Sequence, residues 1–217
     1  MLEDEKTTVS FALITHWHPD HVGGITQLRS ICPSVNISEN DPSDPSYQDT
    51  IDGQIFTIPG ATLRALHCPG HTTNHMAFVL EEEDAMFTGD NVLGHGTAVF
   101  EDLATYMQSL ERMGKHFKGR AYPGHGAVVE DGTAKVREYI QHRQEREQQV
   151  MKVLGEGPRR GMTAMEIVRV VYKDYNPELY EAATKGVLMI LIKLEGEGKV
   201  QEMGEEKWRV VSKGGKL

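Results

Sequence analysis

Apolar residues in the first 130 positions form short runs that alternate with polar segments containing glycine and proline. Short runs of β-branched and apolar residues, bounded by turn residues, are typical of strands. We therefore predict strands over residues 8–15, 35–38, 54–58, 62–68, 76–80, 85–88 and 120–122. Helices are predicted over 20–31 and 101–113, and the polar stretch 39–52 is predicted to be a loop. Alternating strands and helices favour a layered α/β architecture.

The pattern changes after about residue 130, where helical periodicity replaces the short apolar runs. A long charged helix is predicted over residues 133–154. Thr163 is followed three residues later by Glu166, which is the spacing of a capping box at the start of a helix. A strongly amphipathic helix over 178–195 and a hairpin over 199–211 complete the chain. Three helices followed by a hairpin predict a winged-helix-like appendage.

We accordingly divide the chain into a first domain, residues 1–140, and a C-terminal domain, residues 141–217. A length of 217 residues suits one sizeable core with a small appendage. The net charge of −9 disfavours a general nucleic-acid binder without excluding a local basic groove. No apolar run reaches the ~18 residues of a membrane span. The acidic N-terminus does not resemble a signal peptide, so a cytoplasmic location is expected.

The sequence contains ten histidines, and three of them gather with an aspartate in the run HWHPDH at residues 16–21. His16 and His18 alternate in an extended segment, so their side chains point the same way. Asp20 and His21 lie on the following turn and can face a second position nearby. The run follows a predicted buried strand, whose end is a place where such side chains can share one cavity. These four potential metal ligands therefore form two pairs.

Three further segments present a potential ligand directly after a predicted strand. The sequence CPGHT presents His71, TGDN presents Asp90 and YPGHG presents His125. One such segment would be weak evidence, but three of them after the histidine run are hard to attribute to chance. Imidazole and carboxylate ligands favour zinc, iron or manganese. Neither of the two cysteines, Cys32 and Cys68, joins the set.

Seven ligands suffice for two metal ions when one carboxylate bridges them. We predict two Zn²⁺ ions per chain, and Mn²⁺ or iron fits the same ligands. The predicted ligands of the first ion are His16, His18 and His71. Those of the second ion are Asp20, His21 and His125. Asp90 is predicted to bridge the two ions. Open coordination positions would remain for water, which is the mark of a catalytic site. Asp20 is predicted to be the catalytic base as well as a ligand.

The motifs THWHPDH, PGHT, TGD and PGHG, in this order, resemble those of the metallo-β-lactamase superfamily. The spacing of the last three, without a cysteine ligand, is similar to its glyoxalase II and thioesterase-like branches. The segments at residues 89–103 and 139–150 further resemble the β-lactamase-like protein 2 family. The resemblance covers nearly the whole chain. It implies an αββα sandwich, which we expect to lack N-terminal strands because one strand precedes the first motif, and a winged-helix-like C-terminal domain.

Fungal members of this family include stand-alone thioesterases that release aromatic polyketides from synthases without their own thioesterase domain. The resemblance therefore implies a zinc-dependent thioesterase of secondary metabolism. Its substrate would be an acyl thioester on the acyl carrier protein of a fungal non-reducing polyketide synthase. The same metals could direct water to phosphorus, so a single-strand endoribonuclease of this fold stays an alternative. A truncated, inactive pseudoenzyme is the other alternative.

Other residues with functional potential are assigned weaker roles. His75 and His95 could face the substrate, although a supporting or surface role is favoured for both. Trp17 is predicted to pack beneath the site. The apolar face of the helix over 178–195 is predicted to be core, and its leucines are Leu188, Leu191 and Leu194.

Overall fold

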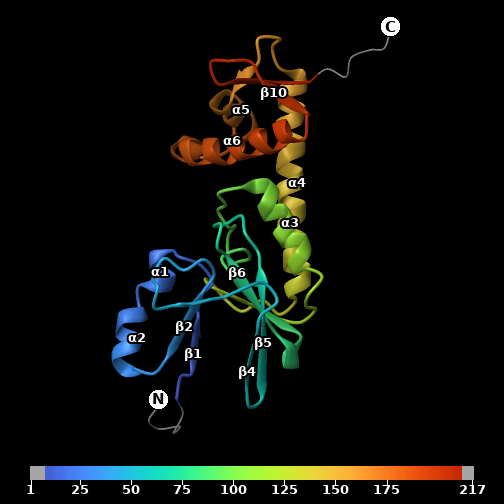
Figure 1. Cartoon of the computed structure of the whole chain (residues 1–217). Helices are drawn as coiled ribbons and strands as arrows, with labels where there is room; N and C mark the ends of the chain where they lie inside the picture. The colour runs from blue at the N-terminus through green and yellow to red at the C-terminus, as the bar shows by residue number, and fades with distance from the viewer. Residues whose placement is uncertain (1–7, 212–217) are drawn as a thin grey trace. The chain divides into compact units, whose positions relative to one another are not determined.

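The computed structural model describes residues 8–211 of the chain (Figure 1). These residues form two compact units, one that ends at Tyr139 and another that begins at Ile140. The long helix α4 (Gly132–Glu156) begins in the first unit and ends in the second. Within residues 8–211, no helix is both long and apolar enough to cross a membrane.

The first unit contains two sheets. The larger sheet has the order β4-β5-β6-β7-β8, with strands β4 (Ile55–Ile58), β5 (Ala61–His67), β6 (Met76–Leu80), β7 (Ala85–Gly89) and β8 (Ala121–Pro123). Its pairings are antiparallel except for the parallel pair of β7 and β8. The smaller sheet is parallel, with strands β1 (Phe11–Leu13), β2 (Asn36–Glu39) and β3 (Gln48–Asp49). β3 lies inside the stretch 39–52, which the sequence predicts to be a loop. A strand of two residues is too short for an alternation of apolar and polar residues to reveal it in the sequence.

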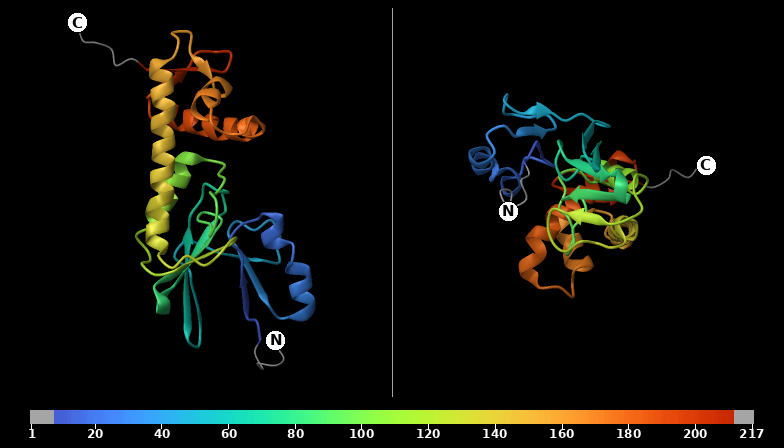
Figure 2. Two further views of the ribbon diagram at one scale, coloured as in Figure 1. Left: turned by 180° about the vertical axis from the view of Figure 1, so that it is seen from behind. Right: turned by 90° about the horizontal axis from the view of Figure 1, so that it is seen from below.

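Two short helices, α1 (Pro19–Val22) and α2 (Ile25–Ile31), lie along β1 and β2 (Figures 1 and 2). Their core consists of four aliphatic residues, Ile14, Ile25, Val35 and Ile37. The prediction of one helix over 20–31 is wrong, because the chain leaves the helix at Gly23 and Gly24. Glycine lowers helix stability. The break makes α1 a separate turn that carries Asp20 and His21.

The larger sheet packs its own aromatic and aliphatic residues between the strands. Phe56, Ala65, Met76 and Phe78 form one buried cluster. A 3-10 turn, η1 (Glu81–Glu83), joins β6 to β7. The helix α3 (Leu103–Met113) buries one face, made of residues at helical spacing: Leu103, Tyr106, Met107, Leu110 and Met113. Tyr106 and Ser109 of α3 donate hydrogen bonds to the carbonyls of Asn91 and Pro69, next to the strand ends at which predicted ligands lie.

The second unit has the winged-helix arrangement of helices and a small antiparallel sheet. Its further helices are α5 (Ala164–Val171), η2 (Pro177–Leu179) and α6 (Tyr180–Gly196). Its sheet has the order β10-β11-β9, with strands β9 (Met162–Thr163), β10 (Val200–Glu202) and β11 (Lys207–Val210). Leu191 and Leu194 are buried as predicted. The prediction for Leu188 is wrong, because this side chain is exposed on α6.

The capping box at the start of α5 gives a test of the second unit. Thr163 accepts a hydrogen bond from the Glu166 backbone N–H, and the Glu166 carboxylate accepts one from the Thr163 N–H. Thr163→Ala should lower the free energy of unfolding by about 1 kcal/mol, because one N–H at the helix start loses its partner. Thr163→Ser should stay close to the wild type. Urea unfolding followed by circular dichroism measures both, and equal losses in both variants would contradict the capping role.

Candidate metal centre

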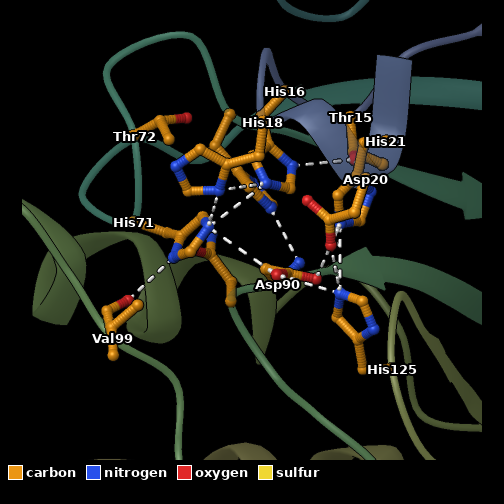
Figure 3. A network of polar contacts seen from close by, with 12 residues as sticks. Thr15, His16, His18, Asp20, His21, His71, Thr72, Asp90, Val99 and His125 are labelled. Carbon is orange, nitrogen blue, oxygen red and sulfur yellow. Dashed lines mark hydrogen bonds and ion pairs between the residues drawn. The ribbon is translucent and has the colours of Figure 1, made fainter. Parts of the chain in front are cut away.

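The seven predicted ligands converge at strand ends of the first unit (Figure 3). His16 and His18 follow β1, and Asp20 and His21 lie on the next element, α1. His71 lies between β5 and β6, Asp90 directly follows β7, and His125 follows β8. The structure arranges these side chains as two groups, each with ligand atoms within 4.8 Å of one another. The first group consists of His16, His18, His71 and Asp90. The second group consists of Asp20, His21 and His125.

Three imidazole nitrogens meet in the first group. His16 Nε2 lies 2.9 Å from His18 Nδ1, and His71 Nε2 lies 3.2 Å and 3.1 Å from these two atoms. His71 uses its other nitrogen, Nδ1, to donate a hydrogen bond to the Val99 carbonyl at 2.8 Å. A neutral imidazole carries a single N–H, so His71 Nε2 presents a lone pair. The three nitrogens therefore suit a shared cation better than hydrogen bonds to each other.

The second group combines two imidazoles with a carboxylate. His125 Nε2 lies 3.0 Å from Asp20 Oδ2 and 3.3 Å from His21 Nε2. The Asp20 side chain is 55% exposed, so it faces solvent at the open side of the group. Asp20 and His125 are thus accessible, whereas the first group is largely buried.

Asp90 is a member of the first group and also lies close to the second group (Figure 3). Its Oδ1 is 3.4 Å from His21 Nε2, and its Oδ2 is 3.5 Å from His125 Nε2 and 3.8 Å from His71 Nε2. Asp90 Oδ1 is buried and accepts no hydrogen bond from the described residues. Burying a carboxylate oxygen in this way is costly unless a positive charge lies beside it. This orphaned oxygen and the converging lone pairs fit a pair of metal ions.

The titration behaviour of these groups also fits metal binding. Burial, together with the neighbouring His21 and His71, lowers the pKa of His16 to about 3. Burial lowers the pKa of His71 as well. Desolvation raises the pKa of Asp20, but its backbone hydrogen bond and the nearby His21 and His125 outweigh this and bring it below its usual value. At neutral pH His16 and His71 are therefore uncharged and Asp20 is ionised, which is the state that metals require.

Hydrogen bonds from outside the ligand set orient the rings. Thr15 Oγ1 lies 3.0 Å from His16 Nδ1 and 3.4 Å from His21 Nδ1, so it can accept both N–H groups. The Val99 carbonyl fills the same role for His71. Sequence reasoning did not identify either residue. The position of Thr15 next to the histidine run could have indicated its role. Nothing in the sequence indicates the role of Val99, which lies 28 residues after His71.

A glycine makes room for the carboxylate at the strand end that leads to His125. A Cβ on Gly124 would lie 2.5 Å from Asp90 Oδ1 and 2.9 Å from His21 Cε1. The Gly124 N–H donates to the Gly89 carbonyl at 2.9 Å. The glycine of the Pro-Gly-His motif at residues 123–125 therefore does more than form a turn. It also lets the loop of His125 contact the loop of Asp90.

The other histidines and Trp17 lie at different depths. His75 is fully buried and accepts a hydrogen bond from the Asp90 backbone N–H, while His95 is exposed. The prediction that Trp17 packs beneath the site is wrong, because this side chain is 49% exposed and lies beside the His18 ring at 4.6 Å. His67 is half-buried, and His116 is exposed.

Two family models match the chain, one in each unit. The model described as metallo-beta-lactamase superfamily matches residues 33–125. The model described as beta-lactamase associated winged helix domain matches residues 163–208. Together they confirm the predicted fold class.

Curated relatives match most of the chain. Lactamase-like protein aptB of Emericella nidulans is 44% identical over 92% of this chain and 67% of its own length. Atrochrysone carboxyl ACP thioesterase of Claviceps purpurea is 41% identical over 95% and 70%. Beta-lactamase-like protein 2 homolog of Drosophila melanogaster is 38% identical over 93% and 73%. The chain therefore spans roughly two thirds of the length of these relatives.

Solved structures share the fold at low sequence identity. A beta-lactamase domain protein from Burkholderia ambifaria superposes with a TM-score of 0.82 at 20% identity, over 97% of this chain and 77% of that one. A metallo-beta-lactamase family protein from Thermus thermophilus gives 0.73 at 23% identity, over 94% and 80%.

The lowered histidine pKa values predict a pH dependence of stability. In chelator-treated protein, His16 and His71 bind fewer protons in the folded state than the unfolded chain does below pH ~6.5. The free energy of unfolding should therefore fall as the pH drops from ~6.5 towards 5. The slope is about 1.4 kcal/mol per pH unit for each proton taken up on unfolding.

Urea unfolding at pH 7, 6 and 5 measures this slope. His16→Gln should make it shallower, because one depressed pKa is removed. His116→Gln changes an exposed histidine and should keep the wild-type slope. Equal slopes in the wild type and His16→Gln would contradict the assignment.

Proposed function

Because this chain belongs to the metallo-β-lactamase superfamily, we propose that it is a dinuclear zinc hydrolase that cleaves acyl thioesters. One observation carries the chemistry: imidazole nitrogens, among them the unprotonated Nε2 of His71, converge beside a buried carboxylate oxygen that accepts no hydrogen bond from the described residues. The substrate class is supported by the Claviceps purpurea relative, which is named as an acyl carrier protein thioesterase. We propose an aromatic polyketide on an acyl carrier protein as the substrate.

The two groups of ligands would hold two metal ions. In this proposal the imidazoles of His16, His18 and His71 hold the first ion. Asp20, His21 and His125 hold the second ion, and the ligand list is completed by the carboxylate that lies between the groups, Asp90. Zn²⁺ accepts this mixture of nitrogen and oxygen ligands, and Mn²⁺ or iron is compatible with it. We assign the chemistry to residues 1–140 and treat residues 141–217 as the winged-helix domain.

Zinc bound here would lower the pKa of water and polarise a carbonyl oxygen. Asp20 is the carboxylate best placed to accept the proton of the attacking water, because it is exposed while the Asp90 side chain is largely buried. The oxygen of the water forms a bond to the thioester carbon, and the carbon–sulfur bond breaks. The leaving thiolate needs little protonation, because thiols have a pKa near 8.5. His125 and Trp17 are also exposed, so the substrate would approach from their side.

Hydrolysis of an acyl-carrier-protein thioester tests this function. With Zn²⁺, the wild type should release the acyl group, and a chelator should abolish release. Asp20→Asn should lower kcat/KM by about 100-fold or more, because a general base contributes this much. Asp174→Asn is the matched control, since Asp174 is exposed in the second unit and should not affect release.

The same preparations should be offered single-stranded RNA. Metal-dependent RNA cleavage that Asp20→Asn abolishes, without thioester hydrolysis, would replace the proposal by the ribonuclease alternative. Two bound metal ions, measured by mass spectrometry, with neither activity would point to another substrate. A folded protein that binds no metal would support the pseudoenzyme alternative.

A further inference from the structure

His75 is a fully buried histidine that belongs to neither ligand group. It directly precedes β6, and its carbonyl accepts a hydrogen bond from the Cys68 N–H at 2.9 Å. The next residue, Met76, donates its N–H to the Thr15 carbonyl at 2.7 Å. His75 thus stands where the end of β1, the loop of His71 and the end of β7 meet.

The His75 side chain is directed at the backbone of a proposed ligand. Its Nε2 accepts a hydrogen bond from the Asp90 backbone N–H at 3.1 Å. Its ring centroid lies 5.2 Å from that of His16 and 5.8 Å from that of His71. An accepting Nε2 places the single N–H of a neutral imidazole on Nδ1. The Nδ1 atom is buried and has no hydrogen-bond partner in the described part of the chain.

Gly89 makes this contact sterically feasible. A Cβ at this position would lie 2.5 Å from His75 Nε2, and the residue has a φ of +52°. The absence of a side chain lets the ring of His75 reach the N–H of the following residue, Asp90. The Gly89 carbonyl in turn accepts the Gly124 N–H, next to His125. The His75 ring therefore lies against the backbone of Gly89 and Asp90, the segment that connects the two ligand groups.

We propose that His75 is a positioning residue that fixes the Asp90 carboxylate between the two metal sites through the Asp90 backbone N–H. This role rests on the proposed function, because it presumes that the seven side chains bind metal. A wrong rotation of the Asp90 backbone would turn its carboxylate away from one group. Loss of this hydrogen bond should therefore lower the affinity for metal while the protein stays folded.

Three variants separate the hydrogen bond from simple packing. His75→Gln places an amide oxygen near the position of Nε2 and keeps an acceptor for the Asp90 N–H. His75→Asn is equally polar, but its shorter amide reaches only the position of Nδ1. His75→Leu fills space without an acceptor. Zn²⁺ affinity is measured by competition with a chromophoric chelator, and Co²⁺ absorption spectra report the geometry of the bound ions.

We expect His75→Gln to bind two Zn²⁺ ions with about the wild-type affinity. His75→Asn and His75→Leu should bind at least one ion about 10- to 100-fold more weakly, the usual effect of losing a group that orients a ligand. Their Co²⁺ spectra should also change. Wild-type affinity and spectra in folded Asn and Leu variants would overturn the role of His75. A wild-type protein that binds no metal would overturn both this role and the proposed function.

Nuclear magnetic resonance of the wild type provides a test that does not depend on how well the variants fold. Long-range ¹⁵N–¹H correlations distinguish the two neutral tautomers of each histidine. We expect His75 to carry its proton on Nδ1 in chelator-treated protein, with an unprotonated Nε2. A proton on Nε2 would overturn the role, because that nitrogen could not then accept the Asp90 N–H.

Discussion

The site in the first unit depends on a fold that holds imidazole nitrogens within about 3 Å of each other. His16, His18 and His71 meet in this way, and His21 and His125 repeat the arrangement at 3.3 Å. Lone pairs at such distances repel, and burial prevents water from separating the nitrogens of the first group. Protonation could relieve the repulsion, but burial lowers the pKa of His16 and of His71. The fold must therefore hold the rings together by other means.

Those means are strand ends and hydrogen bonds from outside the ligand set. Strands end at each ligand loop, and the loops are tied to each other through backbone contacts such as that of Gly124 with Gly89. Thr15 and Val99 take the N–H groups on the far side of the rings, so the lone pairs face inward. Hydrogen bonds of this kind fix the tautomer and direction of a metal-binding histidine. The site is thus prearranged by the fold.

The proposed ligands can be predicted from the sequence because each one is a local feature. A strand ends, a glycine follows, and His71, Asp90 or His125 comes next. The orienting contacts cannot be predicted in the same way, because they join residues distant in the chain. Val99 meets His71 across 28 positions. The exposure of Trp17 and of Leu188 likewise depends on what packs over each side chain, and periodicity does not encode this.

Prearrangement has a consequence for stability as well as for chemistry. The buried Oδ1 of Asp90, which accepts no hydrogen bond from the described residues, is an unfavourable feature of the metal-free fold. The gathered imidazoles add to the cost. Cations bound at the proposed site would remove both penalties, and they would stabilise the folded state by mass action because the unfolded chain cannot present the same side chains together. The second unit has no ligand group among the described residues, so its stability should respond much less to metal than that of the first.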